Sequence, residues 1–70
     1  MKVNELKAEL ARKELTIGEF AELTKIARTT IWKRFKGRGE FNLSEIKRIS
    51  TILGLDNNRI LEIFFDEKVS

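Results

Sequence analysis

The sequence contains no cysteine, no histidine and no proline, and each absence excludes a class of structure. Without cysteine and histidine, the chain forms no disulfide bond and no zinc site built from these ligands. The side chains that most often serve as nucleophile or general base are therefore missing, and no glycine-rich phosphate loop is present. We expect a protein that is not an enzyme and has no catalytic residue, metal, other cofactor or small-molecule substrate.

Long apolar runs are also absent. No segment approaches the roughly 20 apolar residues that cross a membrane, and the N-terminal residues show no signal-peptide pattern. We expect a cytoplasmic protein with no membrane partner. The 70 residues allow one domain, which we place at residues 1–66, and residues 67–70 are expected to form a frayed tail.

Positive charge is concentrated in the first half of the chain. Residues 1–40 contain ten Lys and Arg against six Glu, a net charge of +4, whereas residues 41–70 contain four cations and five acids, a net charge of −1. This asymmetry favours a polyanion bound on one side of the molecule. The alternative is a solvated surface helix whose cations have no specific partner.

The spacing of apolar residues predicts an all-α fold of five short helices with no strand. The expected helices cover residues 3–13, 17–24, 28–36, a fourth segment from the Asn42 cap through Leu53, and residues 57–65. The residues expected on the inward faces of the first four are Val3, Leu6 and Leu10; Phe20, Leu23 and Thr24; Ala27, Ile31 and Phe35; and Leu43, Ile46, Ile49 and Leu53.

Capping signals support these boundaries. Two capping boxes are expected, Thr16 with Glu19 and Asn42 with Glu45, because a hydroxyl or amide at the cap and a carboxylate three residues later satisfy each other's backbone donors. Asp56 is expected to cap the last helix. Gly37 and Gly54 suit the left-handed position that ends a helix.

Residues 16–37 form the most distinctive stretch. It predicts two helices joined by a tight turn at Lys25 and Ile26, and six cations with no acid lie between residues 25 and 38. They are Lys25, Arg28, Lys33, Arg34, Lys36 and Arg38. A helix that presents cations and hydroxyls on one face suits the major groove of DNA.

The pattern formed by Phe20, Ala21, Ile26, Ile31, Phe35 and Gly37 resembles the lambda-repressor-like helix-turn-helix domains. The resemblance extends from Leu6 to Phe64. The length of the chain and its ending, ILEIFFDEKVS, look most like the small Cro-like or modulator-of-repression regulators of temperate phages of Gram-positive bacteria. The resemblance implies a five-helix DNA-binding domain with its helix-turn-helix at the second and third helices, acting as a transcriptional repressor in a bacterial host cell.

Positions matching the family's DNA-reading residues are Arg28, Thr29 and Lys33, which we expect to contact base edges. For Lys33 the alternative is a contact to phosphate alone. Lys36, Arg38, Thr30 and Thr16 are expected to contact the DNA backbone. Thr16 can equally be a plain helix cap.

Several positions depart from the family pattern. Ile17 stands where a glutamine often clamps a phosphate, Lys25 where glycine is common at the turn, and Ala27 where a serine or threonine cap is common. Trp32 has three possible surroundings: the core below the fourth helix, a sugar-phosphate backbone or a protein partner. Ile17 and Trp32 are therefore possible contacts for DNA or for a partner. Arg34 is expected to lay its stem along the core and keep its guanidinium in water.

The last helix has more apolar residues than one inward face uses. With Ile60, Leu61 and Phe64 facing inward, Ile63 and Phe65 are expected at the surface as an interface for a homodimer or a repressor partner. In the alternative, Phe65 folds back onto the core. Two functions follow: a Cro-like DNA-binding regulator, or a protein-interaction modulator that binds a partner repressor.

Overall fold

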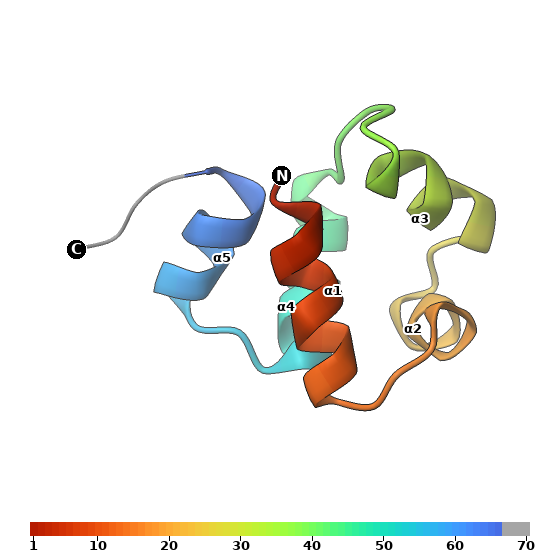
Figure 1. The fold of residues 1–70 in the computed structure, drawn as a ribbon, viewed down its shortest axis with the longest axis horizontal. Coiled ribbons are helices and arrows are strands. Elements are labelled where there is room, and N and C mark those ends of the chain that lie inside the picture. The colour runs from red at the N-terminus through yellow and green to blue at the C-terminus, as the bar shows by residue number, and fades with distance from the viewer. Residues whose placement is uncertain (67–70) are drawn as a thin grey trace.

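The computed structural model describes residues 1–66 and contains five helices within them and no strand (Figure 1). The helices are α1 (Val3–Arg12), α2 (Ile17–Thr24), α3 (Arg28–Phe35), α4 (Leu43–Leu53) and α5 (Asn57–Phe64). The all-α prediction is confirmed, although the first, third and last expected helices were each one residue too long at the C-terminal end. The expected frayed tail, residues 67–70, lies outside the described residues.

One helix and one pair of helices flank a shared centre. In Figure 1, α1 and α4 overlap in the middle of the view, α5 lies to one side, and α2 and α3 lie to the other. α2 packs against α3 and α4, whereas α5 packs against α1 and α4. Every helix contributes to the core, whose completely or almost completely buried apolar side chains are Leu6, Phe20, Ile31, Ile49, Leu53 and Ile63. α3 contributes one fully buried residue, Ile31, and the half-buried Phe35 to the core, and most of its other side chains are exposed.

The expected helix caps are present. Glu19 N donates to Thr16 Oγ1 over 3.1 Å and Thr16 N donates to Glu19 Oε1 over 3.0 Å, which completes the first capping box. Asn42 and Glu45 form the second box in the same way. These bonds satisfy amides that a helix cannot satisfy itself, so each helix start is specified by its local sequence.

The C-terminal signals are confirmed as well. Gly37 and Gly54 have φ values of +80° and +66°, in the left-handed region that closes a helix.

Three residues expected to face inward are exposed instead: Leu23, Ala27 and Leu43. Leu43 is 67% exposed, whereas Phe41, which was expected in a loop, is buried, and its ring packs edge-on against Phe64. Leu23 lies beside the narrow buried stripe of α2, and Ala27 is the cap of α3 rather than part of its stripe.

The prediction for Ile63 was wrong. Its side chain is completely buried, while Ile60, Leu61 and Phe64 are half-buried. The inward face of α5 is centred on Ile63 because α5 packs against both α1 and α4, and Lys2 N donates to Ile63 O over 2.7 Å. Phe65 is 47% exposed, so it neither folds back into the core nor lies beside an exposed Ile63. An interface at Phe65 stays a prediction.

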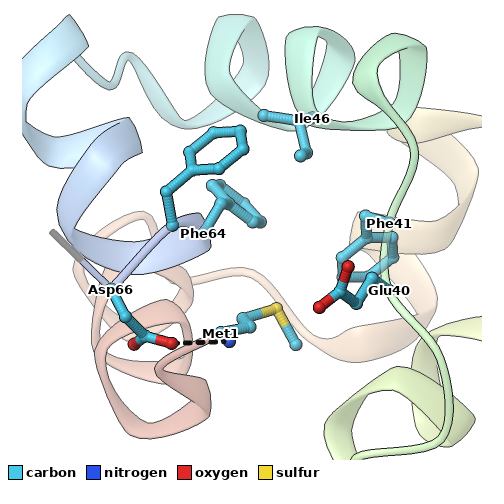
Figure 2. Close-up of a pocket in the computed structure, with 7 residues that line it drawn as sticks. Met1, Glu40, Phe41, Ile46, Phe64 and Asp66 are labelled. Carbon is cyan, nitrogen blue, oxygen red and sulfur yellow. Dashed lines mark hydrogen bonds and ion pairs between the residues drawn. The ribbon is translucent and has the colours of Figure 1, made fainter.

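A small pocket opens beside this end of α5. It has a volume of about 250 Å³, and Figure 2 shows the Met1, Phe41 and Phe64 side chains around it. The N-terminal ammonium group forms an ion pair of 3.3 Å with Asp66 at its edge. This pair and the Lys2–Ile63 hydrogen bond hold the beginning of the described chain against the end of α5.

Candidate nucleic-acid interface

The turn between α2 and α3 is set by Lys25. Its φ and ψ of 62° and 26° lie in the left-handed region, which glycine adopts most easily. The next residue, Ile26, is only 4% exposed and packs into the core. Thr24 is fully buried beside it, and its hydroxyl donates to Phe20 O over 2.8 Å. The residues on both sides of Lys25 are therefore buried, and α3 packs against α2.

α3 exposes a continuous face. At 3.6 residues per turn, five side chains fall within an arc of about 140° on its surface, and the centre of that arc lies about 130° from Ile31. They are Arg28, Thr29, Trp32, Lys33 and Lys36, and all five are exposed. The three expected base-reading residues therefore share one accessible face with Lys36 and Trp32. Thr30 is half-buried and lies about 60° beyond the Lys33 edge of this arc.

Within residues 1–66, none of the six cations between Lys25 and Arg38 forms an ion pair with another described residue. Unpaired cations on one surface produce a positive potential that attracts polyanions. The face therefore combines accessible hydrogen-bond donors with uncompensated charge.

The guanidinium of Arg28 lies against the first turn of α2. A Cβ atom added to Gly18 would overlap Arg28 Nη2 and stand 3.0 Å from its Cζ and 3.2 Å from its Nε. The side chain thus crosses from the start of α3 to the start of α2, which the sequence pattern did not reveal. The signal was present in the sequence as a glycine inside a helix that has no turn to explain it.

Arg34 organises the loop after α3. Its Nη1 donates to Arg38 O over 2.7 Å, and its guanidinium lies where a side chain at Gly39 would be. Arg38 N in turn donates to Lys33 O over 2.9 Å. The residue is half-buried as expected, but its guanidinium binds the loop instead of pointing only into water. This places the exposed Arg38 directly beyond the C-terminal end of α3.

At the start of α2, Thr16 is exposed and serves as the helix cap. The Thr16 amide, followed by its hydroxyl, holds the pKa of the Glu19 carboxyl below its ordinary value of 4.5. A hydrogen bond to the charged form of a carboxylate favours that form, which explains the direction. The structure shows the cap, and the expected phosphate contact of Thr16 stays a prediction.

Ile17 and Trp32, 15 positions apart in the sequence, line one shallow groove of about 310 Å³. Leu10 and Leu15 contribute to its apolar surface. Trp32 is 47% exposed and packs edge-on against Phe35, with ring centroids 6.3 Å apart. Of the three surroundings considered for Trp32, packing under α4 is wrong, because the groove lies between α3, α1 and the start of α2.

Within residues 1–66, no group of three or more acidic side chains is placed to hold a metal ion. None of the helices in that range is long and apolar enough to pass through a membrane. Comparisons with protein-family models, with curated proteins and with solved structures find no match to this chain.

Proposed function

We propose that this protein is a sequence-specific DNA-binding transcriptional regulator in which α2, the Lys25 turn and α3 act as a helix-turn-helix of the lambda-repressor-like kind. The observation that carries the proposal is the exposed face of α3, where Arg28, Thr29 and Lys33 are accessible and the cations have no partner among the described residues. The major groove of B-DNA is about 12 Å wide, which matches the diameter of a helix with its side chains.

Each side chain has a role suited to its chemistry. Arg28 pairs with guanine O6 and N7, Thr29 contacts a base edge or a thymine methyl, and Lys33 donates to a base. Lys36 and Arg38, at and beyond the end of α3, bind phosphates and set the register, with Thr30 and Thr16 beside them. The regulator acts in the cytoplasm of a bacterial host as a phage-type, Cro-like repressor, as a homodimer whose reading helices lie about 34 Å apart. No catalysis is part of this function.

A test uses a random-sequence DNA duplex pool and the control region next to the protein's own gene. Arg28→Ala should cost about 1–3 kcal/mol of binding free energy on the preferred duplex and relax the preference at one base pair. Lys36→Ala should weaken all duplexes alike and make the salt dependence shallower by about one unit.

Arg12→Ala is the matched control, because it removes the same charge from an exposed side chain of α1. It should leave the preference unchanged. Equal losses on preferred and random duplexes for Arg28→Ala would remove its role as a base reader. No binding of the unaltered protein at low salt would overturn the proposal.

The groove that joins Ile17 and Trp32 favours a second candidate function, in which the protein acts by binding a partner repressor. Exposed aromatic side chains beside apolar residues are enriched at protein interfaces. Trp32 is the only tryptophan, so its fluorescence reports on this groove alone. A shift of its emission on adding the neighbouring repressor without DNA, abolished by Ile17→Ser, would favour the modulator. A shift with DNA alone would favour the regulator.

A further inference from the structure

Gly18 differs from the other three glycines of the chain. Gly37, Gly39 and Gly54 all have positive φ values, which explains their residue type, whereas Gly18 lies in the first turn of α2 without one. Glycine is disfavoured inside a helix because it loses more backbone freedom than alanine. The backbone conformation therefore does not account for Gly18, and the reason must lie in what surrounds its missing side chain.

The space that a Cβ atom of residue 18 would fill is occupied by the guanidinium of Arg28. Three of its atoms, Nη2, Cζ and Nε, lie closer to that position than ordinary van der Waals contact allows. Even alanine would displace the group, although the displacement is cheap for folding because it moves only the end of a flexible side chain. Gly18 thus holds a particular arrangement of Arg28 without being needed for the fold.

We propose that Gly18 is a positioning residue for Arg28, and that residue 18 thereby determines how the α3 face discriminates between DNA sequences. The inference rests on the proposed function. A guanidinium seated against α2 is restricted before DNA arrives, so less side-chain freedom is lost when it pairs with a base. A larger residue 18 releases Arg28, which then reaches a different range of positions with weaker discrimination.

A double-mutant cycle tests this coupling with the duplex that the unaltered protein prefers and with a random-sequence duplex. Gly18→Ala should raise or leave unchanged the midpoint of thermal unfolding, yet reduce the ratio of preferred to random affinity by about three-fold or more. In the Arg28→Ala background, Gly18→Ala should change that ratio by less than about 1.5-fold, because the group it displaces is gone.

A second readout does not need DNA. Nuclear Overhauser contacts between the Gly18 α protons and the Arg28 side chain should be present in the unaltered protein. Asn58→Ala, at the equivalent second position of α5, is the control for a helix substitution away from Arg28, and it should leave the DNA preference unchanged.

The outcomes separate the two proposals. If the unaltered protein shows an Arg28-dependent preference but the two substitutions act independently, the positioning role is wrong and the DNA-binding function stands. Absence of the Gly18–Arg28 contacts would also overturn the positioning role. If the unaltered protein binds no DNA, the proposed function fails and the positioning role fails with it.

Discussion

Two arginines occupy opposite situations in this molecule. Arg59, in α5, contacts three carboxylates from two helices: Nε lies 2.6 Å from Glu9 Oε2, and Nη1 contacts Glu5 over 2.9 Å and also Glu62. Arg28, at the start of α3, is exposed and has no ion pair with any described residue. The first arginine joins two helices through ion pairs, whereas the second lies beside Gly18 and forms no ion pair with a described residue.

The difference shows how a structural cation is distinguished from a candidate ligand-binding cation. Glu9 is only 6% exposed, and a buried carboxylate requires a partner, which Arg59 supplies from 50 residues away. The bond to Glu9 is also the main cause of the raised pKa of the Arg59 guanidinium. Arg28, Lys33 and Lys36 form no ion pair with any described residue, so no charge within residues 1–66 accounts for them. Charge alone does not distinguish a structural arginine from a candidate ligand-binding arginine, whereas the presence or absence of an ion pair does.

The largest change in stability is expected from removing apolar volume in α5, the helix that carries Arg59. Ile63→Ala should reduce the free energy of unfolding by about 2–5 kcal/mol, because it leaves a cavity at a completely buried position. Phe65→Ala, two residues later and 47% exposed, should change it by less than about 1 kcal/mol. Chemical denaturation of both variants provides the measurement. A small loss for Ile63→Ala would restore the surface role first expected for Ile63.

Breaking the Arg59 network should have the next largest effect. Arg59→Ala leaves Glu9 buried without its interhelical partner and should cost about 2–4 kcal/mol. Arg12→Ala is the matched control, because Arg12 binds the same Glu9 oxygen over 2.9 Å but is 66% exposed. It should cost less than about 1 kcal/mol. Similar losses for the two variants would show that burial does not distinguish these ion pairs.

On the α3 side, removal of a cation should not destabilise the fold. Lys25→Gly should leave the free energy of unfolding unchanged or raise it by up to about 1 kcal/mol, since relief of the left-handed backbone opposes the extra freedom of the unfolded chain. Lys25→Ala removes the charge but keeps the Cβ atom, so it separates the two effects. A loss above about 1 kcal/mol for the glycine variant would mean that the lysine side chain supports the turn.

The smallest expected effect is on the thermal stability of the protein at acidic pH. The pKa of Glu19 is lowered in the folded protein, so its contribution is complete above its ordinary value of 4.5 and is lost as the pH falls through the folded-state pKa. Glu19→Gln should therefore flatten the decrease of the unfolding midpoint between about pH 5 and about pH 3. Glu22→Gln, on the exposed surface of the same helix, is the control. An unchanged pH dependence in Glu19→Gln would show that the carboxylate does not stabilise the cap.

Local signals in the sequence determined most of the secondary structure. The capping boxes at Thr16 and Asn42, the left-handed residues Gly37 and Gly54, and the apolar spacing specified where helices begin and end. These features depend on neighbours within four residues, so they are readable without knowledge of the fold. The exposure of Arg28, Thr29 and Lys33 was predictable for the same reason, since Ile31 fixes which side of α3 faces the core.

Only the tertiary structure decided which residues meet across helices. Glu9 is not among the residues expected on the inward face of α1, but it is buried and bonded to Arg12 and Arg59. The inward face of α5 was misassigned at Ile63, because a short helix with apolar residues on several sides has no single face until α1 and α4 select one. The contact between the Arg28 guanidinium and Gly18, and the groove shared by Ile17 and Trp32, also could not be predicted, because each joins residues of different helices. Helical periodicity determines the direction in which a side chain points from the axis of its own helix. Contacts between helices depend on how the helices pack against one another.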